Sequence, residues 1–209
     1  MITTLLLIRH GETPWNTLGK VQGMTNIDLS ENGIMQAKCL RDRLNGHFSA
    51  VYSSPLNRAY ETAQILCENT SIEPIKIDDL REINYGSWEG LTFKEIARDY
   101  KTGYETWKTD EEKGTMVDGD QSIYNVSVRG RNCVLDLIKK HPGETIAIVS
   151  HGGFIKSTLI GLFGWKMTMY HHFALGNTCI TTIDFTDELK PILIGINDTH
   201  HLTSKVPTV

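Results

Sequence analysis

Residues 5–16 read LLLIRHGETPWN, and the abrupt change inside this stretch guides the interpretation of the whole chain. Four apolar residues, typical of a strand buried on both faces of a parallel sheet, are followed directly by Arg9, His10 and Gly11. The strand therefore delivers a guanidinium and an imidazole to its carboxyl end, where a loop begins. Two adjacent basic side chains stabilise an apolar core poorly, but they are well suited to binding an anion.

The composition is that of an ordinary globular protein. The 209 residues suffice for one domain with a sizeable core; 40% of them are hydrophobic and 22% are charged. The net charge of −4 gives no overall attraction to nucleic acid or to an anionic membrane. We therefore predict neither kind of partner, and an anion site has to be a local concentration of positive charge.

The cysteines and the N-terminus bear on metal sites and on the compartment. The four cysteines are widely spaced and form no C-x-x-C pair, which argues against a zinc knuckle or a dithiol redox centre. The N-terminal apolar run is too short for a signal peptide, and no stretch approaches the roughly 18 apolar residues of a transmembrane helix. These features predict a cytoplasmic protein with reduced thiols.

Strand and helix patterns alternate along the chain. Apolar runs predict strands at 3–8, 50–54, 75–77, 145–150, 178–185 and 191–196, of which we expect the last two to pair as a C-terminal hairpin. Helical spacing predicts helices at 31–45, 54–68, 93–101, from 126 towards the HPG break at 141–143, and at 154–163. The pattern indicates one three-layer α/β domain over 1–209, a mostly parallel sheet flanked by helices.

Polar residues at the expected helix starts support these assignments. Ser30 and Ser54 have the character of N-caps, and Pro55 follows at the first position of its helix. Thr92 and Glu95 have the spacing of a capping box.

The segment 101–121 resists assignment. It is polar and contains glycine, but it also carries Tyr104, Trp107 and Met116. The segment is either a surface excursion pinned to the body by its aromatic residues or a lid over a site.

Three separate segments send basic side chains to one edge of the predicted sheet. The first strand ends in Arg9 and His10, a later strand ends before His151, and Arg58 lies in the first turn of the helix that follows a third strand. Ligands of open α/β sheets bind beyond the carboxyl ends of the strands. A single histidine or arginine in such a place is ordinarily structural or solvent-facing, but the convergence of three segments favours an anion site.

Taken together, these segments resemble the histidine phosphatase superfamily, which has the phosphoglycerate-mutase-like fold. The resemblance covers nearly the whole chain, and its motifs are LIRHGETPWN, DLSENGIMQA, SSPLNRAYETA, LREINYGSWEG and VSHGG. The isolated triplet RHG would be a weak signal, whereas the set is specific.

The resemblance implies a role for each matching residue. His10 would be the nucleophile that becomes phosphorylated, while Arg9, Arg58 and His151 would bind the phosphoryl oxygens. Glu82 falls where the family has its proton donor. The residues implied to complete the phosphate pocket are Asn16, Gln22, Gly23 and the amide of Gly152.

The implied function is a phosphomonoester hydrolase that acts on small-molecule phosphate monoesters through phosphohistidine. No metal or other cofactor is expected, since two guanidinium groups can neutralise a phosphoryl group and no carboxylate cluster adjoins the motifs. The alternatives are a phosphoglycerate-mutase-type transferase and a noncatalytic phosphate-binding regulatory module. The family's mutases carry ERHYG where this chain has EINYG, which favours the phosphatase branch.

The physiological substrate and the oligomeric state, monomer or homodimer, stay open. Many phosphatases of the family have GGES where this chain has GDQS at 119–122, so the substrate contact at Asp120 and Gln121 is uncertain. We expect substrate selectivity to come from aromatic residues after the acid loop, unless these are simply packed onto the sheet: Tyr85, Trp88, Tyr104 and Trp107. The remaining histidines are expected to be structural or solvent-facing: His47, His141, His171, His172, His200 and His201.

Overall fold

A computed structural model describes residues 1–116 and 122–202, and its described strands form one six-stranded sheet in the order β3-β2-β4-β1-β5-β6. The parallel strands are β1 (Thr3–Arg9), β2 (Ala50–Ser53), β3 (Ile75–Lys76) and β4 (Thr145–Ser150). Strands β5 (Ile180–Phe185) and β6 (Pro191–Asp198) run antiparallel to their neighbours and form a hairpin. The predicted mostly parallel sheet and C-terminal hairpin are confirmed.

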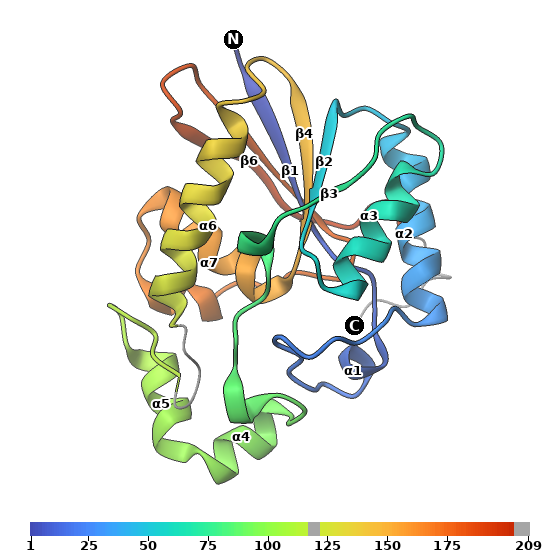
Figure 1. Cartoon of the computed structure of the whole chain (residues 1–209). Helices are drawn as coiled ribbons and strands as arrows, with labels where there is room; N and C mark the ends of the chain where they lie inside the picture. The colour runs from blue at the N-terminus through green and yellow to red at the C-terminus, as the bar shows by residue number, and fades with distance from the viewer. Residues whose placement is uncertain (117–121, 203–209) are drawn as a thin grey trace.

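Helices cover both faces of the sheet, as Figure 1 shows. On one side lie α2 (Glu31–Leu44) and α3 (Asn57–Cys67), and on the other α6 (Ile123–Ile138) and α7 (Gly152–Phe163). The shorter helices α1 (Pro14–Thr17), α4 (Phe93–Asp99) and α5 (Lys101–Thr109) lie at the end of the sheet towards which β1 runs. Three 3₁₀ turns complete the order: η1 (Asp78–Leu80), η2 (Gly86–Trp88) and η3 (Met167–His171).

Strand β1 is apolar throughout because both of its faces are buried. Leu5 and Leu7 belong to the core beneath α6 and α7, whereas Leu6 and Ile8 belong to the core beneath α2 and α3. The pleat sends alternate side chains to opposite faces, so the LLLI run contributes to both layers. As a result β1 has a fixed register between β4 and β5, and its carboxyl end is held at the centre of the sheet edge.

The predicted helix starts are partly correct. Ser30 accepts a hydrogen bond from the amide of Gly33, and Thr92 and Glu95 form the expected capping box. The prediction for Ser54 is wrong: α3 begins at Asn57 after Leu56, which makes no side-chain cap. The sequence predicts no helix for the segment 101–121, but its first part forms α5, whereas its residues 117–121 lie outside the described residues.

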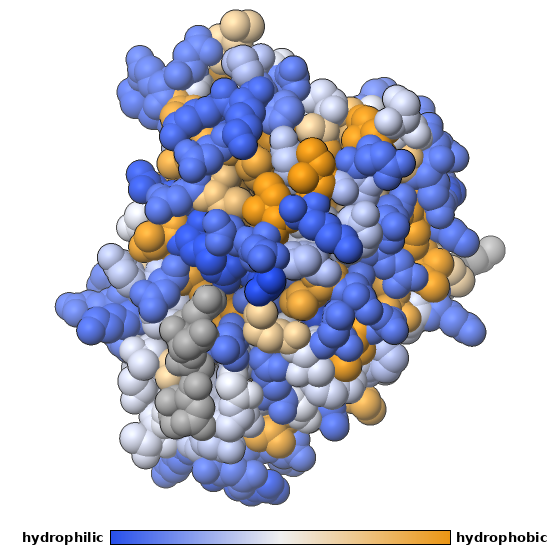
Figure 2. Space-filling model, in the orientation of Figure 1, coloured by the Kyte–Doolittle hydropathy of each residue, from blue (hydrophilic) through white to orange (hydrophobic). Residues whose placement is uncertain are grey.

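The surface view in Figure 2 shows polar side chains over both helical layers of this face, with apolar residues gathered between them. Ile75, on the edge strand β3, has an exposed fraction of 52%. Over the described ranges, no helix combines the length and the apolar character that crossing a bilayer requires. The cytoplasmic location stays a prediction, as does the single-domain organisation.

A glycine sets the distance between α6 and α7, and α7 carries part of the site described below. A Cβ atom added at Gly161 of α7 would lie 2.3 Å from the backbone oxygen of Ser127 of α6. Backbone oxygen cannot rotate away as a side chain can, so the helices would have to separate.

We expect Gly161→Ala to lower the free energy of unfolding by about 1–3 kcal/mol, the usual cost of overpacking. This loss would occur although alanine is the better helix former by up to about 1 kcal/mol. Gly195→Ala is the matched control, because a Cβ at Gly195 meets no atom within 4 Å. Urea denaturation measures both variants, and equal stability of the two would contradict this account of helix packing.

Candidate active site

The basic residues singled out in the sequence lie together at the carboxyl edge of the sheet. Arg9 ends β1 and His10 follows it, His151 follows β4, and Arg58 is the second residue of α3. A cavity of about 560 Å³ opens there. Its lining includes eight of the predicted catalytic and phosphate-binding residues, namely Arg9, His10, Asn16, Gln22, Gly23, Arg58, Glu82 and Gly152.

The hydrogen bond of His10 determines which ring nitrogen can act as a nucleophile. Its Nδ1 lies 2.6 Å from the backbone oxygen of Gly11. A carbonyl oxygen can only accept, so Nδ1 carries the proton and Nε2 keeps its lone pair. The ring is 3% exposed, and the tautomer is therefore set inside a buried site.

The backbone of His10 is held from three sides. Its amide donates to the oxygen of Ser150 at the end of β4. Its carbonyl accepts from the side chain of Asn177 at 3.1 Å and from the amide of Thr178 at 3.2 Å. Thr178 has a φ of +54°, which is strained for a β-branched residue, so the loop before β5 is constrained where it supports the nucleophile.

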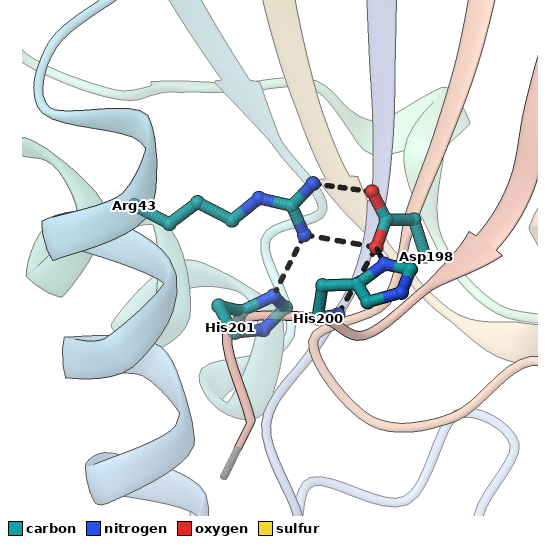
Figure 3. A network of polar contacts seen from close by, with 4 residues as sticks. All are labelled: Arg43, Asp198, His200 and His201. Carbon is teal, nitrogen blue, oxygen red and sulfur yellow. Dashed lines mark hydrogen bonds and ion pairs between the residues drawn. The ribbon is translucent and has the colours of Figure 1, made fainter.

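The C-terminal residues extend this support (Figure 3). His201 Nε2 lies 3.0 Å from the hydroxyl of Thr178, and its Nδ1 accepts from Arg43 of α2. Arg43 also pairs with Asp198, which in turn binds His200. Burial and the guanidinium of Arg43 lower the pKa of His201 to about 4. His201 is thus held in a structural network, whereas the side chain of His200 faces solvent, and both fit the structural or solvent-facing roles expected from the sequence.

Arg58 is 1% exposed, and backbone carbonyls hold it in place. Its guanidinium donates to the oxygen of Gly23 at 2.7 Å and to that of Thr25 at 2.9 Å. The carboxylate of Glu89 anchors the same loop by accepting from the amides of Met24 and Thr25. Five N–H groups belong to a guanidinium, so Arg58 retains donors for a ligand.

His151 lies beside His10, with ring centroids 5.3 Å apart, and is fully buried. Its Nε2 lies 2.7 Å from the hydroxyl of Ser54, which also accepts from the amide of Leu56. The Ser54 hydroxyl has a proton free to donate to Nε2, and in that tautomer the ring proton of His151 lies on Nδ1. The hydroxyl that was expected to cap α3 instead orients a histidine of the site.

Several buried donors of this site lack a partner among the described residues. They are the Nε atoms of Arg9 and Arg58 and, in the tautomer that accepts from Ser54, the Nδ1 atom of His151. Unpaired buried donors are costly, and here they gather around one cavity. An anion with several oxygens satisfies them together.

The charges of the site keep both imidazoles neutral. Burial, followed by the guanidinium groups of Arg58 and Arg9, holds the pKa of His10 well below its usual value. Burial and Arg58 lower the pKa of His151 in the same way. Burial lowers the pKa of Arg58 to about 10, so its guanidinium is still cationic at neutral pH. The site therefore combines fixed positive charge with an unprotonated nucleophile.

Glu82 is bound by the N-terminus of α7. Its carboxylate accepts from the amides of Ile83 at 2.9 Å, Gly153 at 3.0 Å and Phe154 at 2.6 Å. A Cβ added at Gly153 would lie 2.7 Å from Glu82 Oε1 and from the hydroxyl of Tyr85. Glycine is required where the helix approaches the carboxylate this closely, and the approach fixes Glu82 at the cavity.

The four aromatic residues predicted to contact the substrate differ in their position relative to the cavity. Tyr85, Tyr104 and Trp107 line the cavity, whereas Trp88 is fully buried and packs edge-on against Trp107 behind the wall. Trp107 is itself 3% exposed. Their contribution to substrate selectivity stays a prediction, with the role of Trp88 confined to packing.

The wall also includes residues that the sequence does not predict as site residues, among them Lys156, Tyr170 and His171. His171 was expected to be structural or solvent-facing, but it lies on the wall with Nε2 3.1 Å from the oxygen of Trp107. Lys156 had a usable signal, since it is the one charged residue in the apolar run FIKSTLIGLF. It lies one helical turn beyond Gly152, which places both on one face of α7.

No cluster of three or more histidine, cysteine, aspartate or glutamate side chains suited to a metal ion occurs within residues 1–116 and 122–202. The single carboxylate among the described lining residues is that of Glu82.

We expect His10 and His151 to stay neutral in solution at pH 6, because the lowered pKa moves protonation below the ordinary value of about 6.5. NMR titration of ring signals, assigned with His10→Asn and His151→Asn, tests this. Arg58→Gln should raise the pKa of His10 by removing a neighbouring cation. A His10 ring that titrates near 6.5 in the unsubstituted protein would refute the electrostatic account.

Comparisons with known proteins agree with this geometry. Residues 5–199 match the family model of the histidine phosphatase superfamily, branch 1. Phosphoserine phosphatase 1 of Hydrogenobacter thermophilus is 32% identical, covering 95% of this chain and 93% of its own. The metal-independent phosphoserine phosphatase of Arabidopsis thaliana is 31% identical, covering 97% of this chain and 84% of its own.

A solved structure is similar over the same range. The phosphoserine phosphatase mutant from Entamoeba histolytica in complex with phosphoserine is 42% identical, with a TM-score of 0.89 over 96% of this chain and 100% of that one. The chain belongs to the histidine phosphatase superfamily.

Proposed function

We propose that this protein is a metal-independent phosphatase that hydrolyses small phosphate monoesters through a phosphohistidine at His10. The observation that carries the proposal is the Nδ1–H bond from His10 to the oxygen of Gly11, which leaves Nε2 unprotonated beside two guanidinium groups. Phosphoryl transfer depends chiefly on positioning and charge neutralisation, and both are built into this cavity.

In the first step Nε2 of His10 attacks phosphorus. An N–P bond forms as the ester P–O bond breaks, and the leaving oxygen takes a proton from Glu82. Arg9, Arg58 and the Nδ1–H of His151 stabilise the phosphoryl oxygens, with Asn16 and the amide of Gly152 nearby in the cavity lining. The unpaired buried donors described above find their acceptors in this state.

In the second step water attacks the phosphohistidine. The water gives a proton to the carboxylate of Glu82, the N–P bond breaks and inorganic phosphate leaves. Glu82 thus regains the proton that it donated, and His10 returns to its neutral tautomer. The amides of Gly153 and Phe154 hold the carboxylate in one place during both transfers.

Phosphoserine is the first candidate substrate. Two similar proteins, from Hydrogenobacter thermophilus and Arabidopsis thaliana, are phosphoserine phosphatases by name, and the similar structure from Entamoeba histolytica contains phosphoserine. A substrate of this size suits a cavity of about 560 Å³.

We expect hydrolysis of phosphoserine and p-nitrophenyl phosphate to be unchanged by EDTA. His10→Asn should abolish turnover of both, while His47→Asn, at an exposed turn, serves as the control. Release of inorganic phosphate is the measurement. Activity that vanishes on chelation and returns with Mg²⁺ or Zn²⁺ would refute the mechanism.

Glu82→Gln should slow the hydrolysis of phosphoserine, whose leaving group is a basic alkoxide, by roughly 10²–10⁴-fold. It should slow the hydrolysis of p-nitrophenyl phosphate much less, because nitrophenolate leaves without a proton. The loss of kcat/KM in Glu82→Gln, measured for both substrates on the same preparation, tests this prediction. Equal losses would show that Glu82 orients the substrate and does not donate the proton.

A further inference from the structure

Lys156 is a half-buried cation on the wall of the active-site cavity. It lies on α7 one turn beyond Gly152, and its Nζ donates to the backbone oxygen of Tyr170 at 3.1 Å. The ammonium also lies 5.0 Å from the ring centroid of Tyr170 and 5.5 Å from that of Phe173. These contacts hold the side chain at the cavity.

The positive charge of Lys156 has no ion-pair partner within residues 1–116 and 122–202. An ammonium has three donors, and the oxygen of Tyr170 uses one of them. The ionisable groups around it are Arg9, Glu82, Tyr170 and His171, and Glu82 is the one carboxyl group among them. Burial and Arg9 lower the pKa of Lys156 to about 8, as expected of a cation short of compensating charge.

The cavity thus holds more positive charge than a phosphate group needs. A phosphate monoester dianion is matched by the guanidinium groups of Arg9 and Arg58. The carboxylate of Glu82 is already bound by three backbone amides. Lys156 is therefore available for a second anionic group on the same substrate.

We propose that Lys156 binds a carboxylate of the substrate and so restricts the enzyme to phosphorylated hydroxy acids and amino acids. The inference rests on the proposed phosphatase function and adds the chemical class of its substrate. A carboxylate fits because it is planar, carries one charge and accepts two donors of an ammonium. The aromatic rings beneath Lys156 exclude water from one side of the pair, which strengthens it.

Two matched substrate pairs test the proposal. Phosphoethanolamine is phosphoserine without its carboxylate, and glycerol 3-phosphate has a hydroxymethyl group where 3-phosphoglycerate has its carboxylate. The unsubstituted enzyme should have a higher kcat/KM for the carboxylate member of each pair. Lys156→Met should reduce that value by about 10- to 100-fold, mainly through KM, the usual range for a lost hydrogen bond to a charged group.

The ratio within each pair is the decisive readout. With Lys156→Met and with Lys156→Gln the ratio should approach one, and Lys156→Arg should restore part of it. Lys108→Met removes an exposed cation from the same cavity and should keep the unsubstituted ratio. If kcat/KM fell by the same factor for both members of a pair in the Lys156 variants, Lys156 would have a structural role only. A changed ratio in Lys108→Met would instead assign the binding of the carboxylate to Lys108.

The four esters distinguish a failure of the role of Lys156 from a failure of the proposed phosphatase function. Hydrolysis of all four esters without preference for the carboxylate members overturns the role of Lys156 and leaves the phosphatase function standing. No release of phosphate from any ester overturns the proposed function itself.

Discussion

The structure depends on burying two guanidinium groups beside two neutral imidazoles at the carboxyl edge of the sheet. Burial alone opposes the charge of Arg9 and Arg58, and their pKa values are lowered accordingly. Backbone oxygens of residues 23, 25 and 175 offset part of this cost. The remaining donors point to a polyanionic ligand, and burial, reinforced by the same cations, keeps His10 and His151 unprotonated. The buried guanidinium groups thus contribute both to the affinity for phosphate and to the nucleophilicity of His10.

The loops around the site are built to hold these charges in place. Glu89 binds the amides of Met24, Thr25 and Tyr85, so it joins the loop that supports Arg58 to the segment that carries Glu82. On the opposite side, Asn177 and the network of His201 support the backbone of His10. Few of these supporting residues touch the cavity, yet they determine where the charged groups lie.

Much of the site could be predicted from the sequence because its residues adjoin strong local patterns. Arg9 and His10 come at the end of one apolar run, and Arg58 and His151 follow two other apolar runs. The predicted strand ends therefore indicated the positions of all four residues. Ser54 was misassigned because a serine before proline looks like a cap, and its partner His151 is distant in the chain. Helix α5 was missed because its stability comes from Trp107 packing among Trp88, Phe93 and Tyr170. The contact of Lys156 with Tyr170 is likewise a tertiary one.

We infer that neutral Nε2 of His10 forms the bond to phosphorus. The most direct measurement is rapid quenching of the enzyme with radiolabelled phosphoserine under conditions that preserve phosphohistidine, followed by peptide mapping and phosphorus NMR. We expect a phosphoryl group on Nε2 of His10 that forms and decays at rates compatible with turnover. A label on Nδ1 of His10, on another residue, or no covalent label during turnover would contradict it.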